Sequence, residues 1–161
     1  MRWVLALRSA GADRLRGDQL LSAKRVARTQ VRLIDVLEPI IAECDALAEK
    51  EVDREEAFRA CVAEVLDHIA SGALSLRDAY ASTPKERVGE AKAAALSSPA
   101  FRKSLNGKPL AALARPLFDA CEASVQASED ARSASYLFVC VSELASLLRN
   151  VANDLLSDLV A

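Results

Sequence analysis

The sequence predicts an all-α protein, and three observations support this. Ala, Leu, Arg and Glu dominate the 161 residues, and all four are strong helix formers. Only five glycines and five prolines interrupt the chain, and aromatic residues make up 4% of it, which disfavours a β-sandwich or a barrel. Apolar residues recur at the helical period in several segments, whereas no segment shows the alternation of a strand. We therefore expect a helical bundle.

The whole chain, residues 1–161, is expected to form a single helical domain. A chain of this length buries about 70% of its unfolded surface, so it needs no metal or disulfide to hold a core. No linker exceeds a few residues, and we find no internal repeat. Residues 1–17 are interpreted as an N-terminal arm and a basic loop that Gly11 and Gly17 bracket.

The first of two long amphipathic helices is predicted over about residues 18–49. Asp18 is a good N-cap. The apolar positions then repeat every seven residues, as in a helix that packs in a bundle; they are Leu20, Ala27, Ile34, Ile41 and Ala48. Pro39 lies inside this segment and is expected to kink it.

Several shorter helices are predicted to pack across the long ones. Each is expected to begin at a residue that is typical of a helix start; these residues are Asp53, Ser75, Thr83, Ser98 and Pro109. Gly72 and Asn106-Gly107 are the expected stops. Pro84, directly after Thr83, is expected to fill the first turn of its helix.

The second long helix is predicted over about residues 129–160, with Ser128 as its cap. Both long helices would span about 48 Å at 1.5 Å per residue, whereas a compact chain of this size has a radius of gyration near 15 Å. Projecting apolar ends need a cover, and a second copy of the chain is the simplest one. The candidate apolar oligomer face consists of Leu144, Leu148, Val151, Leu155 and Leu159.

Charge alternates in blocks along a chain whose net charge is −2. Residues 1–32 carry +6, residues 33–83 carry −8, residues 84–115 carry +5 and residues 116–161 carry −5. Such blocks favour complementary packing within the fold or between copies.

Cations gather on one arc of the first long helix, opposite its apolar arc. The candidate anion-binding or partner-binding basic face consists of Arg14, Arg16, Lys24, Arg25, Arg28 and Arg32. Three interpretations stay open at this point. The face is solvated, or it docks onto an acidic surface of this chain or another subunit, or it contacts nucleic-acid phosphates without reading sequence. Arg102, Lys103 and Lys108 could assist the third.

Four cysteines, Cys44, Cys61, Cys121 and Cys140, are scattered without a CxxC pair. The favoured interpretation is reduced core cysteines, and the alternative is one or two structural disulfides. The longest charge-free run covers ten residues, 133–142, whereas about twenty are needed to span a bilayer. The apolar stretch at residues 3–7 is short for a signal peptide. We therefore expect a cytoplasmic protein that does not enter a membrane.

Catalytic chemistry has little support in the sequence. His68 is the only histidine, with Glu64 one turn before it and Asp67 beside it, and a metal site would need further ligands. No glycine-rich phosphate-binding motif is present. Glu55-Glu56 is expected to complement a helix dipole and not to act as an acid/base pair. We expect no enzyme activity, cofactor or metal.

The sequence thus predicts a non-enzymatic helical protein-interaction module. Its expected partner is a second copy of the chain, in a homo-oligomer, or another protein subunit of a larger assembly. The alternative is a small helical subunit of a nucleoprotein complex, which would bind backbone phosphates non-specifically through the N-terminal basic face.

Overall fold

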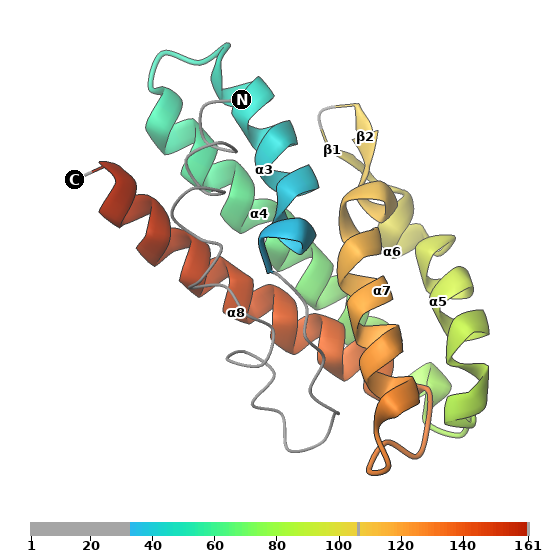
Figure 1. Cartoon of the computed structure of the whole chain (residues 1–161). Coiled ribbons are helices and arrows are strands. Elements are labelled where there is room, and N and C mark those ends of the chain that lie inside the picture. The colour runs from blue at the N-terminus through green and yellow to red at the C-terminus, as the bar shows by residue number, and fades with distance from the viewer. Residues whose placement is uncertain (1–32, 106, 161) are drawn as a thin grey trace.

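The structure is a computed structural model that describes residues 33–105 and 107–160, and it is an all-α helical bundle (Figure 1). The main helices in chain order are α3 (Leu33–Ala48), α4 (Arg54–Leu76), α5 (Val88–Leu96), α6 (Pro99–Arg102), α7 (Leu110–Ala127) and α8 (Ser135–Val160). Two 3₁₀ turns, η1 (Asp78–Tyr80) and η2 (Lys85–Arg87), lie between α4 and α5. The predicted fold class is confirmed.

The centre of the bundle is the long contact between α4 and α8 (Figure 1). Helix α3 packs on α4 and α7 packs on α8, while α5 lies outside α7. The core contains four fully buried phenylalanines, Phe58, Phe101, Phe118 and Phe138. The predicted helix over residues 18–49 is described only from Leu33 onward, as α3.

The last helix begins later than predicted, at Ser135 and not at residue 129. The Ser128 hydroxyl accepts hydrogen bonds from the backbone N–H groups of Asp130 and Ala131, at 3.2 and 3.3 Å, so it closes a turn. The following loop is then held by the segment before α5. The Ala134 N–H donates to the Thr83 carbonyl at 2.8 Å, and Lys85 donates to the Ser128 carbonyl.

Helix α4 begins as predicted but does not end at Gly72. The Asp53 carboxylate caps it by accepting from the Glu56 N–H at 3.1 Å. The helix then runs through Gly72 to Leu76, because the glycine serves packing and not termination. A Cβ at position 72 would lie 3.1 Å from the buried Phe101 ring, so glycine lets α6 approach α4 closely.

Two further expectations for this region need correction. The helix expected from Ser75 is a single 3₁₀ turn, η1. Pro84 has an extended backbone (ψ 149°) and pairs with Ser133 in an isolated bridge, so Thr83-Pro84 does not start a helix as predicted.

A small hairpin, which the sequence did not predict, joins α6 to α7. Strand β1 (Ser104–Leu105) pairs antiparallel with β2 (Lys108–Pro109). Gly107 has φ +88°, a conformation that side-chain-bearing residues rarely adopt. The Leu110 N–H donates to the Lys103 carbonyl at 2.7 Å, which fixes the start of α7.

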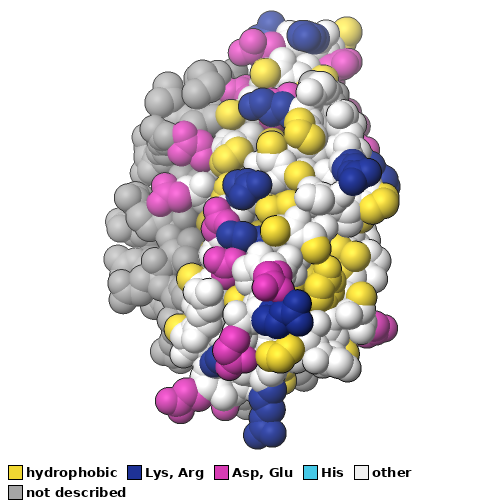
Figure 2. Space-filling model, turned by 90° about the vertical axis from the view of Figure 1, so that its right-hand side faces the viewer, with side chains coloured by type: hydrophobic (Ala, Val, Ile, Leu, Met, Phe, Trp, Pro, Cys, Tyr) yellow, Lys and Arg dark blue, Asp and Glu magenta, His cyan; other side chains and the backbone are white. Residues whose placement is uncertain are grey.

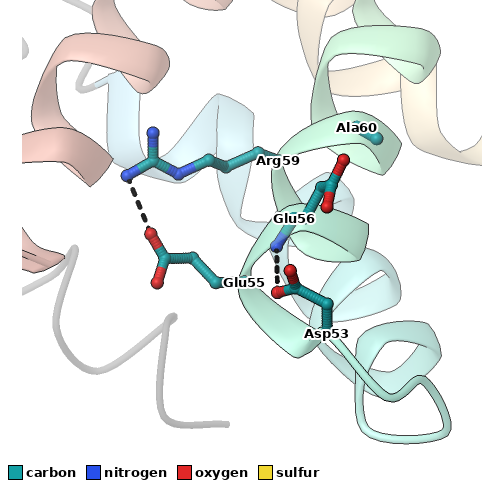
Figure 3. Close-up of a pocket in the computed structure, with 5 residues that line it drawn as sticks. All are labelled: Asp53, Glu55, Glu56, Arg59 and Ala60. Atoms are coloured by element: carbon teal, nitrogen blue, oxygen red, sulfur yellow. Dashed lines mark hydrogen bonds and ion pairs between the residues drawn. The ribbon is translucent and has the colours of Figure 1, made fainter.

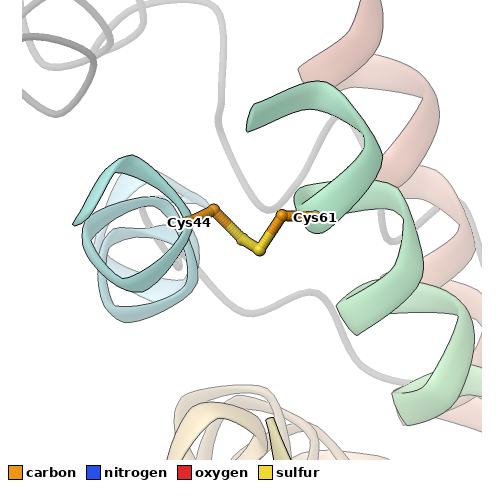
Figure 4. Close-up of a disulfide and its surroundings, with 2 residues drawn as sticks. All are labelled: Cys44 and Cys61. Carbon is orange, nitrogen blue, oxygen red and sulfur yellow. A yellow bond between two sulfur atoms is a disulfide. The ribbon is translucent and has the colours of Figure 1, made fainter. Parts of the chain in front are cut away.

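All four cysteines are paired in disulfides, so the favoured interpretation of reduced cysteines is wrong. Cys44–Cys61 ties α3 to α4 (Figure 4), and Cys121–Cys140 ties α7 to α8. The Cα–Cα distances, 5.5 and 5.7 Å, lie in the usual range for disulfides. Spacing alone could not reveal the pairs, because 17 and 19 residues separate their members. Each disulfide therefore braces one pair of consecutive helices from inside the core.

The candidate apolar oligomer face is in part core. Leu144 and Leu148 are 3% and 0% exposed, because they face the chain's own helices, so they cannot meet a partner. The side chains of Val151, Leu155 and Leu159 lie outside what the structure describes. Within the described residues, no helix combines the length and the apolar character that crossing a membrane requires.

Opening either disulfide is expected to destabilise the fold. Removing a link that closes a loop of this length lowers the free energy of unfolding by about 3 kcal/mol. The test is urea unfolding of Cys44→Ala/Cys61→Ala and of Cys121→Ala/Cys140→Ala beside the wild type, each with and without a reductant. Alkylation under denaturing, non-reducing conditions should find no free thiol in the wild type. Free thiols there, or a reductant that leaves the wild-type transition unmoved, would contradict the pairing.

Replacement by alanine should have opposite effects on stability at Gly72 and Gly89, which lie in α4 and α5. Gly89→Ala meets only the Glu122 carboxylate at 3.7 Å, so the helix propensity of alanine should stabilise the protein by up to about 1 kcal/mol. Gly72→Ala should lower the free energy of unfolding, because the added methyl group would crowd the Phe101 ring, which is buried in a close-packed core and cannot easily move. Urea unfolding of both variants measures the contrast, and equal stabilisation by both would refute the close-approach role of Gly72.

Candidate functional site

The groove between α5 and the first turns of α7 is the candidate functional site. Its volume is about 430 Å³, within the general range of ligand pockets. It is lined by Lys92, Ala93, Leu96, Ser97, Pro109, Ala111, Ala112 and Arg115. Figure 2 shows the side of the molecule on which α5 lies, where exposed apolar side chains alternate with lysines, arginines and carboxylates.

The groove exists because the facing surfaces of the two helices carry small side chains. Helix α5 buries Val88, Ala91, Ala95 and Leu96 and leaves Ala93 exposed. Helix α7 is anchored by buried Leu113 and Ala114, while Ala112 is exposed and Ala111 half-buried. Methyl groups cover the backbone but do not fill the space between the helices. The floor is therefore apolar and open to solvent.

Lys92 joins the two walls of the groove. Its Nζ lies 2.9 Å from an Asp119 carboxylate oxygen and 3.2 Å from a Glu122 oxygen, both on α7. The hydrogen bond to Asp119 raises the pKa of Lys92 above its ordinary value of 10.5, against the opposing effect of burial. Lys92 is therefore a charged strut between α5 and α7, and its charge is already matched by the chain.

Three cations near the groove are unmatched. Arg115 lines it, and Arg102 and Lys103 lie where α6 meets the start of α7. All three side chains are exposed, and none forms an ion pair with any residue that the structure describes. Lys108, in contrast, lies 3.5 Å from the Glu43 carboxylate. Of the cations that line the groove, Arg115 is thus the one without a carboxylate partner among the described residues.

A second recess lies at the start of α4 and belongs to the helix cap. It is lined by Asp53, Glu55, Glu56, Arg59 and Ala60, with a volume of about 470 Å³ (Figure 3). Asp53 caps the helix, and Glu55 lies 3.3 Å from Arg59 (Figure 3). The Glu55-Glu56 pair occupies the first turn of α4, as predicted, where carboxylates complement the helix dipole.

A third recess, of about 290 Å³, lies between α4 and α8. Arg59 and Arg149 reach it together with Asn150 and Asn153. Arg59 pairs with Glu55, and Arg149 lies 3.3 Å from Asp67, so neither guanidinium carries unmatched charge into the recess. These contacts tie exposed side chains of α4 and α8 to their neighbours and make this recess a weaker ligand site than the groove.

His68 lies on the surface of α4. Its Nε2 is 3.6 Å from the Glu64 carboxylate one turn earlier, while Asp67 turns to Arg149. Over residues 33–105 and 107–160, no group of three or more His, Cys, Asp or Glu side chains is placed to hold a metal ion.

The structure does not reach the predicted basic face. Arg14, Arg16, Lys24, Arg25, Arg28 and Arg32 all lie outside the described residues, so that face stays a prediction. Sequence reasoning missed the groove. The sequence places Ala93 and Ala112 on exposed positions of their helices, but it does not show that the two helices lie side by side.

Comparison with protein-family models, with characterised proteins and with solved structures found no match. The groove is therefore interpreted from its own geometry and charge.

Replacing Lys92 by methionine should weaken the fold in a pH-dependent way. Below pH 10.5 the variant should lose on the order of 1 kcal/mol, since Asp119 and Glu122 lose their cation. A folded-state pKa above the unfolded one stabilises the protein at lower pH, and this contribution disappears as pH rises through the folded value. The stability difference between wild type and Lys92→Met should therefore shrink above pH 10.5.

The measurement is urea unfolding of both proteins at a series of pH values. Arg87→Met is the control, because Arg87 forms an exposed ion pair with Glu90 at the start of α5 and should cost less than about 0.5 kcal/mol. A Lys92→Met deficit that stays constant through the alkaline range would refute the charged strut.

Proposed function

We propose that this protein is a helical protein-interaction module that binds a partner protein through the α5–α7 groove. The observation that carries the proposal is the groove itself. An apolar, solvent-open floor made of alanine and leucine lies beside Arg115, which forms no ion pair with the described residues. Protein-binding surfaces combine an apolar centre with a polar rim, and this is the arrangement that the groove offers.

The frame around the groove supports the same function. The two disulfides brace the consecutive helix pairs, and the Lys92 strut fixes the spacing of α5 and α7. A surface that is already ordered before binding loses less conformational entropy when a partner arrives. The bundle is thus suited to present a preformed groove.

The partner could be a second copy of this chain or another subunit, as the sequence analysis expects. The disulfides favour a protein that folds in an oxidising compartment over the cytoplasmic location that the sequence suggested, because cytosolic thiols are generally kept reduced.

A photo-crosslinking residue at position 112 should capture the partner in cells of the native source. Ala112 lines the groove and is exposed. The same residue at position 94 is the matched control, because Ala94 is an exposed alanine of α5 that does not line the groove. Mass spectrometry identifies the adduct, and light scattering shows whether the partner is the chain itself.

The identified partner should then bind the purified wild type and Ala94→Trp alike. Ala112→Trp should bind at least about tenfold more weakly, which is a loss of about 1.4 kcal/mol, because the indole fills the groove. Equal adducts from both positions, or equal binding by both tryptophan variants, would refute the proposal.

A further inference from the structure

We infer that the α5–α7 groove receives a short acidic amphipathic segment of the partner protein. In this arrangement an apolar side chain of the segment packs on Ala93, Leu96 and Ala111, and a neighbouring carboxylate pairs with Arg115. The inference rests on the proposed function and adds the chemistry of the partner to it.

The charges around the groove favour an acidic occupant. Lys92 is paired with Asp119 and Glu122 of α7, so Arg115 is the cation lining the groove that lacks a carboxylate partner among the described residues. Arg115, Arg102 and Lys103 are exposed and have no carboxylate partner within the described residues. A basic segment would meet like charge at Arg115, whereas an acidic segment would supply its missing counter-charge.

Arg115 is the best placed of the three cations for recognition. It lines the groove, one helical turn beyond Ala111 and Ala112. A guanidinium can hold a carboxylate through two parallel hydrogen bonds, which fixes the orientation of the bound group. An apolar side chain on the alanine floor and a carboxylate on Arg115 would together define the register of the segment.

The dimensions of the groove favour a short contact. From Ala111 to Arg115 the wall advances by about 6 Å, at 1.5 Å per residue, and from Lys92 to Ser97 by about 7.5 Å. This is little more than one helical turn, so the groove fits one or two apolar side chains and not a long helix. The floor lacks the aromatic rings on which nucleic-acid bases stack, so the groove fits a peptide better than it fits single-stranded nucleic acid.

The experiment is a selection from a library of random short peptides displayed on phage. The bait is the full-length wild-type protein in its oxidised form. Arg115→Glu is screened in parallel, and Arg132→Glu is the matched control. Arg132 is also exposed, makes no ion pair with the described residues and lies outside the groove, so both variants change the net charge equally.

Peptides enriched on the wild type should share an apolar residue with Asp or Glu close to it. By fluorescence anisotropy, the best of them should bind Arg115→Glu at least about tenfold more weakly, a loss of about 1.4 kcal/mol. Its affinity for Arg132→Glu should stay within about twofold of wild type, and its affinity for the wild type should fall as salt is raised. Ala112→Trp should compete with the peptide and weaken its binding.

Several results would overturn the inference. In the selection, these results are enrichment of basic peptides, equal enrichment on the wild type and on Arg115→Glu, or no enrichment at all. In a competition experiment, the contradicting result is a single-stranded oligonucleotide that displaces the selected peptide from the wild-type protein. Circular dichroism and urea unfolding must show that Arg115→Glu folds as the wild type does. A partner captured at position 112 together with non-acidic peptides would refute the acidic segment and leave the interaction module standing. Failure of both experiments would refute the module itself.

Discussion

The packing of α4 against α8 is the interaction on which the rest of the structure depends. The two helices pack closely, and each carries a stripe of buried apolar residues, with Val62, Leu66 and Ile69 on α4 and Val141, Leu144 and Leu148 on α8. Helices α3 and α7 then cover the remaining apolar sides of this pair, and a disulfide holds each of them to its neighbour. Because the apolar stripe of α8 is buried inside the bundle, Leu144 and Leu148 are not available to contact a partner protein.

Local signals predicted the helices better than their ends. Asp53 correctly placed the start of α4, and Pro109 correctly placed the start of α7. The errors arose where tertiary contacts overrode local preference. Gly72 resembles a helix stop but accommodates Phe101, and Pro84 resembles a first-turn residue but pairs with Ser133. Neither Phe101 nor Ser133 is close in sequence, so no local pattern could have revealed them.

The groove was hidden from the sequence for a related reason. Alanine is both a strong helix former and a small side chain, and the sequence shows only the first property. Whether an exposed alanine leaves space depends on what faces it. The space between Ala93 and Ala112 exists only because α5 and α7 pack side by side, and Lys92 reaches across them to Asp119 and Glu122. The alternation of charge blocks did anticipate such pairs, because Lys92 and Lys108 of the basic block 84–115 meet acidic residues on other blocks.

The same pairs explain why the unmatched cations are informative. The acidic and basic blocks neutralise one another where helices meet, as Lys92 and Lys108 show. Arg115, Arg102 and Lys103 belong to the same basic block but stand beyond the reach of its acidic counterparts in the described chain. An exposed cation alone means little, since solvation satisfies it. Arg115 is different because it lines an apolar groove, and an occupant that covers the groove would displace part of its water. Such an occupant must then supply the negative charge itself.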